Sequence, residues 1–246
     1  MYQWDDILIV GDSYACSRHT PDHWPAALAI KLTGREYDKK KPRGEGFPGG
    51  AWWSTRKNLL KELDVRVPKI LIICHTNEDR LPSDHDYGLT SGCVHHEHLV
   101  WKPAGDTNYT SDIWKATCSY FKYLYSPSYH LWAMERWFIE LDSILDEHEI
   151  PVVIHLHCFP KKTPGLPGPS NSTPWIFRNG VTSVGTLRDL SDRYGNNAVE
   201  TPGQFANHFK IPENLKIADA LYDAIVNFKP EQNGTVQNLN LLRDPL

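Results

Sequence analysis

The sequence has no excess of positive charge. Its 246 residues carry 26 Lys and Arg against 30 Asp and Glu, a formal net charge of −4, and the one short basic tract is Lys39-Lys40-Lys41 with Arg43. A protein that binds nucleic acid through the phosphates needs a cationic surface. The composition therefore argues against a nucleic-acid partner.

Cysteine is scarce and follows no pattern. The five cysteines, at positions 16, 74, 93, 118 and 158, are odd in number and widely spaced. In a chain of this size such spacing indicates reduced thiols rather than a disulfide framework.

A long apolar stretch is missing from the first residues. Met1 to Asp6 carry no positive charge, and the apolar run that follows, 7–10, is four residues long. A signal peptide needs an apolar region of about 7–15 residues, and a membrane-spanning helix needs about 20. We therefore expect a soluble chain with no membrane partner.

The sequence does contain alternating strand and helix patterns. Continuous apolar runs at 7–10, 69–74 and 151–157 are typical of strands buried on both faces of a parallel sheet. Helical patterns cover 21–32, the stretch from Trp52 to Leu63, 112–149 and 212–228. This alternation predicts a layered α/β domain with a mainly parallel sheet.

The domain is expected to span 1–228, followed by a polar C-terminal tail at 229–246. It contains one long insertion, about 81–110, which is rich in His, Asp, Gly and Tyr. This insertion has neither a helical nor a strand period, so we expect an irregular surface excursion, either functional or disordered.

Polar residues and glycines stand where the predicted strands end and the helices begin. Ser13 and Asn77 follow two of the strands, and Gly49 and Gly50 precede a helix. Ligands of open parallel sheets bind at the carboxyl ends of the strands. These positions are therefore the candidate site.

Four segments together resemble the SGNH/GDSL hydrolase family: Gly11-Asp12-Ser13, Gly49-Gly50, Thr76-Asn77 and Asn207-His208-Phe209. Their order and placement match the family over about residues 5–228. The resemblance implies the SGNH hydrolase fold, a three-layer α/β/α sandwich with a flavodoxin-like sheet. It also implies serine ester hydrolysis with no cofactor and no metal.

The resemblance assigns a role to each position. Ser13 is the expected nucleophile, and His208 is the base that a serine hydroxyl needs near neutral pH. The expected oxyanion hole consists of the backbone N–H groups of Ser13 and Gly50 and the side-chain amide of Asn77. Gly49 is the alternative to Gly50.

The triad acid is absent from its usual position. The family places an aspartate three residues before the histidine, and Phe205 stands there in this sequence. Three explanations stay open. A backbone carbonyl could orient His208 in a Ser-His dyad, a carboxylate could come from elsewhere, with Glu200 the nearest upstream, or the site could have lost its activity.

A closer resemblance is to SGNH-like proteins of tailed bacteriophages. It is carried by the stretch Phe121 to Pro127, the long helix and the strand Pro151 to His157 after it, Thr76 to Arg80, and Asn207-His208-Phe209. It implies an esterase or deacetylase acting on acylated carbohydrate, made in the host cytoplasm and carried in the virion. Other virion proteins are then the expected partners, contacted through 81–110 and 229–246. Five aromatic residues suit either sugar stacking or packing: Trp52, Trp53, Trp101, Tyr109 and Trp114.

Two other interpretations compete with the hydrolase. One is a metal site, but neither histidine-rich group has a regular zinc spacing: Cys93, His95, His96 and His98, or His155, His157 and Cys158. We therefore expect no metal. His155 and His157 are expected to line the wall of the site. His75 is expected to be a further wall residue or an alternative proton carrier. The other is an inactive virion structural or adhesion protein that keeps the fold as a scaffold.

Overall fold

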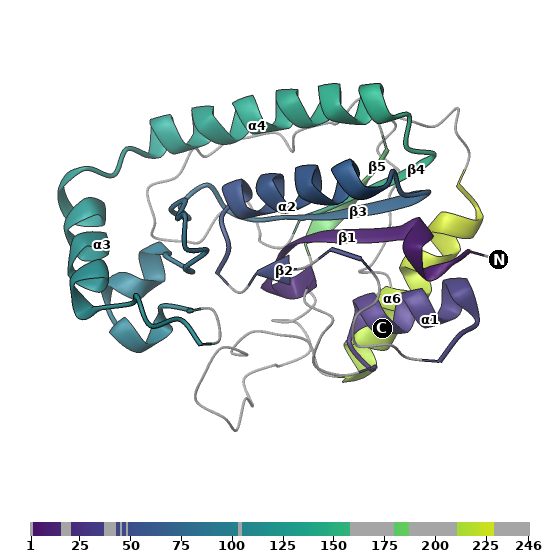
Figure 1. The fold of residues 1–246 in the computed structure, drawn as a ribbon, viewed down its shortest axis with the longest axis horizontal. Helices are drawn as coiled ribbons and strands as arrows, with labels where there is room; N and C mark the ends of the chain where they lie inside the picture. Colours follow the sequence, from purple (N-terminus) through teal and green to yellow (C-terminus); the bar gives the residue numbers. More distant parts are fainter. Residues whose placement is uncertain are drawn as a thin grey trace.

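A parallel five-stranded sheet forms the centre of the protein (Figure 1). The computed structural model describes residues 2–15, 21–36, 43–44, 46–47, 49–102, 105–157, 180–186 and 211–228. Its strands are β1 (Ile7–Asp12), β2 (Gly46–Phe47), β3 (Ile70–His75), β4 (Val152–His157) and β5 (Val181–Thr186). All neighbouring strands are parallel, in the order β2-β1-β3-β4-β5. This order is also found in flavodoxin-like sheets.

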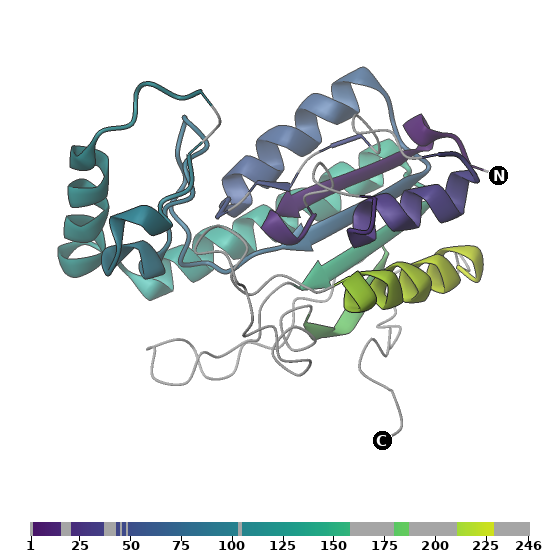
Figure 2. The same ribbon diagram turned by 90° about the horizontal axis from the view of Figure 1, so that it is seen from below.

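Helices cover both faces of the sheet (Figure 2). On one face α1 (Trp24–Thr33) and α6 (Ile211–Val226) pack against strand residues such as Ile9 and Ile72. On the other face α2 (Trp52–Val65) and α4 (Pro127–His148) pack against the intervening residues, such as Val10 and Ile73. Side chains alternate between the faces of a strand, so burial on both faces explains the continuous apolar runs. The predicted layered α/β architecture is confirmed.

The helical pattern predicted over 112–149 is two helices. The chain forms α3 (Ser111–Tyr123) and then α4. The Ser126 hydroxyl accepts a hydrogen bond from the Tyr129 N–H, and Pro127 occupies the first position of α4. A serine cap followed by proline begins a helix, which is why the two helices separate here.

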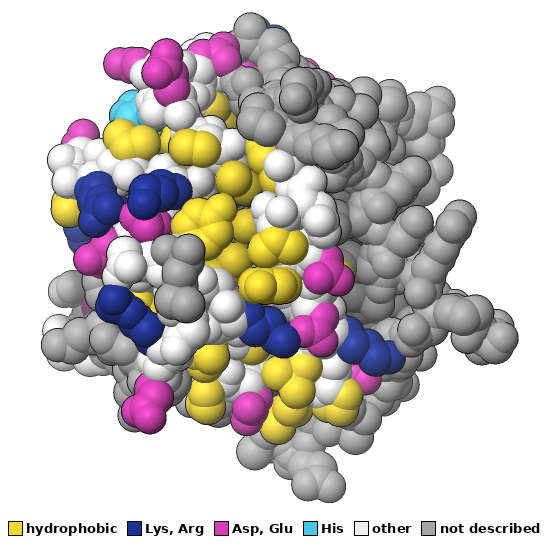
Figure 3. All heavy atoms as spheres, turned by 90° about the vertical axis from the view of Figure 1, so that its right-hand side faces the viewer, with side chains coloured by type: hydrophobic (Ala, Val, Ile, Leu, Met, Phe, Trp, Pro, Cys, Tyr) yellow, Lys and Arg dark blue, Asp and Glu magenta, His cyan; other side chains and the backbone are white. Residues whose placement is uncertain are grey.

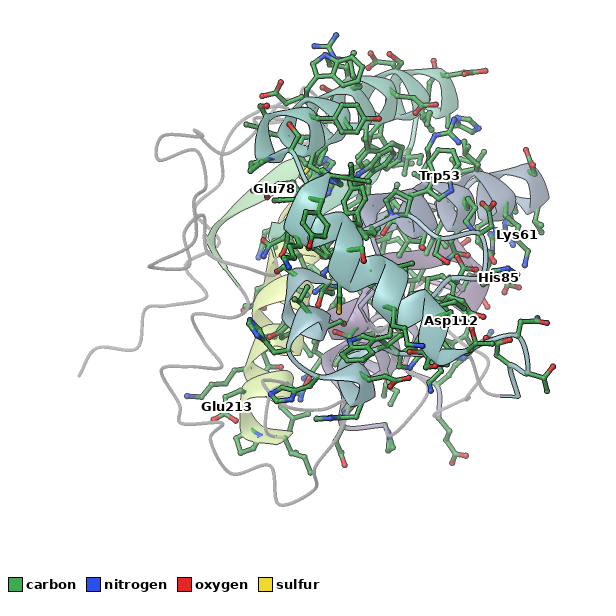
Figure 4. The ribbon with its side chains drawn as sticks, turned by 90° about the vertical axis from the view of Figure 1, so that its left-hand side faces the viewer. Trp53, Lys61, Glu78, His85, Asp112 and Glu213 are labelled. Carbon is green, nitrogen blue, oxygen red and sulfur yellow. The ribbon has the colours of Figure 1, made fainter. Side chains whose placement is uncertain are left out.

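The excursion predicted at 81–110 is largely irregular in its described part, and it packs into a folded unit. Together with α3 this stretch forms a small lobe, residues 81–123, beyond the carboxyl ends of the strands (Figures 1 and 2). The lobe contains the short 3₁₀ helices η3 (Ser91–Val94) and η4 (Glu97–Leu99), and it has an apolar cluster of its own: Leu81, Tyr87, Leu89, Cys93, Val100, Tyr109, Ile113 and Trp114. These residues are irregularly spaced, so their burial leaves no period in the sequence. Figure 4 views the lobe from outside, with His85 and Asp112 labelled on it.

The lobe is attached to the start of α2. Lys57 of α2 forms an ion pair with Asp86 at 2.7 Å, and the Ser54 hydroxyl donates to the same carboxylate at 3.3 Å. Gly88 of the lobe lies so close to Gly49 that a Cβ on Gly49 would stand 2.7 Å from the Gly88 Cα. These contacts place the lobe next to the turn between β2 and α2.

Three tyrosines in and beside the lobe are expected to ionise at a higher pH than a free tyrosine. The Asp106 carboxylate beside the hydroxyl raises the pKa of Tyr87 to about 12, and burial with the nearby Glu97 raises the pKa of Tyr109 to about 12. Burial, with Asp79 and Glu78 near, raises the pKa of Tyr125 to about 12. In an unfolded chain each would ionise near 10. Their contribution to stability is therefore complete below pH 10 and is lost as the pH rises through about 12.

Tyrosinate absorbance during a pH titration measures this directly. We expect Tyr87, Tyr109 and Tyr125 of the folded protein to ionise near pH 12, and the same three residues to ionise near pH 10 in urea. A folded protein whose tyrosines all ionised near pH 10 would contradict the described environment of the lobe.

The face at the amino ends of the strands carries mixed charge. Figure 3 shows basic and acidic side chains interspersed with apolar ones there. Asp6, which is buried, pairs with Arg66 at 2.9 Å and with Lys69 at 3.0 Å. Of the helices in the described part of the chain, none is both long and apolar enough to cross a membrane.

Candidate functional site

Ser13 is the one residue between Asp6 and Ala15 that is not buried. It follows the last residue of β1 and begins the short 3₁₀ helix η2 (Ser13–Ala15). The carboxyl end of a central parallel strand is where the sequence predicted the nucleophile. The chain thus presents a single, partly exposed hydroxyl at the end of a buried strand.

The Asp12 side chain shapes the backbone around Ser13. Asp12 is fully buried, and its Oδ1 accepts a hydrogen bond from the Tyr14 N–H at 2.9 Å. An aspartate that bonds the backbone two residues onward closes a turn around the residue between them. The conformation of Ser13 therefore depends on the position of the Asp12 carboxylate.

Strand register brings Asn77 to the same edge of the sheet. Gly11 of β1 is paired with Cys74 of β3, so the two strands end side by side and lead into Ser13 and Asn77. The strands approach closely there, because a Cβ on Gly11 would stand 2.5 Å from the Cys74 carbonyl oxygen and Gly11 has φ +149°. Asn77 is partly exposed, as expected for a side chain that can reach a ligand.

The Gly49-Gly50 turn reaches the same edge through β2. Asp12 is paired with Phe47, and the chain then turns at Gly49, which has φ +68°. The Gly50 N–H donates to the Phe47 carbonyl oxygen at 2.8 Å. The Gly50 N–H therefore already has an acceptor, and it would have to share or exchange that acceptor to bind an oxyanion.

Arg80 joins two of these segments, and the sequence did not single it out as a site residue. Its guanidinium donates from Nη1 to the Gly50 carbonyl oxygen at 3.1 Å. Its Nη2 pairs with Asp12 Oδ2 at 3.3 Å. The Arg80 side chain is 9% exposed and that of Asp12 is 0% exposed, so both charges are buried. The sequence offered one signal, a lone arginine three residues after Asn77.

His75 and His155 form a buried pair beneath the carboxyl edge. His75 Nε2 and His155 Nδ1 are 3.0 Å apart, and the rings of His75 and of Phe138 from α4 form a T-shaped pair with centroids 5.2 Å apart. One ring nitrogen donates and the other accepts, so the contact selects a tautomer for each ring. Both histidines lie on the α2 and α4 side of the sheet, where their neighbours Ile73 and Val153 belong to the apolar cluster.

The start of α6 is tied to the residue after Ser13. The Asn214 side-chain oxygen accepts from the Trp24 N–H at 3.0 Å, and the Trp24 indole donates to the Tyr14 carbonyl oxygen at 2.7 Å. His208, Phe205 and Glu200 lie outside the described residues, as do Cys158 and the tail 229–246. The described chain resumes at Ile211, at the beginning of α6.

Trp52, Trp53, Tyr109 and Trp114, which suit sugar stacking, have packing partners within the protein. Trp52 stacks on Trp137 with ring centroids 6.5 Å apart, and Arg56 lies over the ring of Trp53. Trp114 donates its indole N–H to the Cys93 carbonyl oxygen, and Tyr109 packs in the lobe. Of these residues Trp53 is labelled in Figure 4, on α2. The tryptophans of α2 and those of the lobe therefore stabilise two different parts of the structure.

The histidine-rich stretch of the lobe is exposed. His95, His96 and His98 face solvent, whereas Cys93 is buried. Over the residues that the structure describes, no group of three or more His, Cys, Asp or Glu side chains could hold a metal ion.

Comparison of the chain with protein-family models, with curated proteins and with solved structures gives no match.

Proposed function

We propose that this protein is a serine ester hydrolase of SGNH type and has the SGNH hydrolase fold. Ser13 is the nucleophile, His208 is the general base, and the Ser13 N–H and the Asn77 amide donate to the oxyanion. Gly50, or Gly49 in its place, is the third donor. The observation that carries the proposal is the lone partly exposed Ser13 in a buried run, at the carboxyl edge that Asn77 and the Gly49-Gly50 turn also reach.

Chain length supports the role of His208. His208 precedes Ile211 by three residues, which limits the separation of their Cα atoms to about 10 Å. The first turns of α6 are tied through Asn214 and Trp24 to Tyr14, the residue next to Ser13. The short connection and these contacts support the assignment of His208 as the base.

The reaction uses side chains and backbone donors alone. The Ser13 oxygen attacks the acyl carbonyl carbon while His208 takes its proton, and the negative oxygen that forms is held by the N–H donors. The carbon–oxygen bond to the alcohol then breaks, and the protonated His208 returns the proton to the leaving oxygen. A water molecule then gives a proton to His208 and attacks the acyl carbon. The bond from that carbon to the Ser13 oxygen breaks, His208 returns the proton to Ser13, and the acid is released.

Acylated carbohydrate is the proposed substrate class, and the virion is the proposed location. Both follow from the resemblance to phage SGNH-like proteins. The alternative, an inactive scaffold in the virion, is favoured by Phe205, which stands where the family has its aspartate.

Covalent labelling of Ser13 tests the proposal. Phenylmethylsulfonyl fluoride is expected to modify Ser13, as read by mass spectrometry of the digested protein, because only an activated serine reacts readily with it. The Ser13→Ala variant serves as the control for site, and Ser54, a buried serine bonded to Asp86, as the internal control for selectivity. An unmodified Ser13 under conditions that fully label a known serine esterase would refute the proposed function.

A further inference from the structure

Arg80 is placed to couple the two sides of the proposed active site. One arm of its guanidinium holds the Gly50 carbonyl at the start of α2, and the other holds the Asp12 carboxylate at the end of β1. Asp12 in turn accepts from the Tyr14 N–H and so closes the turn around Ser13. A continuous path of hydrogen bonds and one ion pair therefore runs from Gly50 to the backbone on both sides of Ser13.

We infer that Arg80 is a positioning residue that sets the Gly49-Gly50 turn relative to Ser13. The inference rests on the proposed function, since it concerns the geometry of the same site. The Arg80 side chain is 9% exposed, and its guanidinium contacts protein groups. It acts on the reaction through the peptide groups that it orients.

The planar guanidinium is what this role requires. Arginine presents several N–H donors in a rigid fork, so it can hold a carboxylate and a carbonyl at a fixed separation. Lysine carries the same charge on a single nitrogen at the end of a flexible chain. An Arg80→Lys variant therefore keeps a cation near Asp12 and loses the fixed link to Gly50.

The chain offers a matched control in Arg43. Its side chain is 10% exposed, pairs with Glu62 at 3.1 Å and donates to the Arg66 carbonyl oxygen at 3.0 Å. These partners lie at the C-terminal end of α2, away from the Gly49-Gly50 turn. Arg43→Lys therefore also removes a guanidinium that contacts two protein groups, but at a place away from the site.

The test compares the two variants in turnover of p-nitrophenyl acetate. We expect Arg80→Lys to lower kcat about tenfold or more with KM changed less than about twofold, because misplaced donors weaken binding of the transition state more than binding of the substrate. Arg43→Lys should keep kcat within about twofold of wild type. It should lower Tm by about as much as Arg80→Lys does. An unchanged kcat in Arg80→Lys, or an equal loss in both variants, would overturn the inference.

Amide hydrogen exchange gives a second readout that needs no catalysis. Arg80→Lys is expected to raise exchange at both the Tyr14 and the Gly50 amides, whereas Arg43→Lys should leave both unchanged. If only one amide responds, the two segments are not coupled and the inference fails. A wild-type protein without Ser13-dependent turnover would refute the proposed function separately, and the exchange result would still decide whether Arg80 couples the two segments.

Discussion

Replacing Ser13 by alanine is expected to lower the turnover of p-nitrophenyl acetate by roughly 10³-fold or more, because the residual rate comes only from binding and the oxyanion donors. His208→Ala should cost about as much, and the double variant should lose no more than either single variant. Groups that act in one proton transfer are not additive, since removing either one stops the same step.

Steady-state kinetics of the three variants, with thermal unfolding measured alongside, checks this prediction. Ser13 is partly exposed, so its substitution should leave Tm close to that of wild type. His98→Ala removes an exposed histidine of the lobe and is the matched control, with unchanged turnover expected. Losses that simply multiplied in the double variant would show that Ser13 and His208 act in separate steps, against the proposed mechanism.

Replacing Arg80 by methionine is expected to lower the free energy of unfolding by about 3–5 kcal/mol. The substitution removes the cation that pairs with Asp12, a carboxylate with no exposed surface. The Gly50 carbonyl loses a donor at the same time. Urea denaturation of the wild type and the variant measures the difference.

A second substitution identifies the cause of that loss. Asp12→Asn in the Arg80→Met background removes the buried charge, so the double variant should regain a substantial part of the stability. Lys115→Met is the exposed control, because Lys115 and Asp112 form a solvent-exposed pair and no measurable change is expected. Equal stability of Arg80→Met and wild type would mean that the ion pair contributes nothing to the fold.

Part of the fold could be predicted from local patterns. Strands β1, β3 and β4 are central and buried on both faces, so each appears as a continuous apolar run. β2 has only two residues, Gly46 and Phe47, and lies at the sheet edge, so no apolar run in the sequence predicted it. The β-branched residues Val181, Thr182 and Val184 after Gly180 were the available signal for β5, which was also missed.

The lobe could not be predicted in this way. Its apolar residues are spread over 81–114 without a helical or strand period, and they meet only when the 3₁₀ helices fold back onto α3. A regular hydrophobic period arises when a helix or strand buries one face against a neighbouring layer. A cluster that a segment forms largely with itself produces no such period.

The candidate site could likewise be predicted only in part from the sequence. The sequence by itself determined that a serine, an asparagine and a pair of glycines stand where strands end and helices begin, because these positions depend on local patterns of a few residues. Only the tertiary structure decided that Arg80 connects Asp12 with Gly50, that His75 is paired with His155, and that the Gly50 N–H already has an acceptor. Each of these contacts joins residues that are adjacent in space through strand pairing or a turn, and such geometry leaves no regular spacing along the chain.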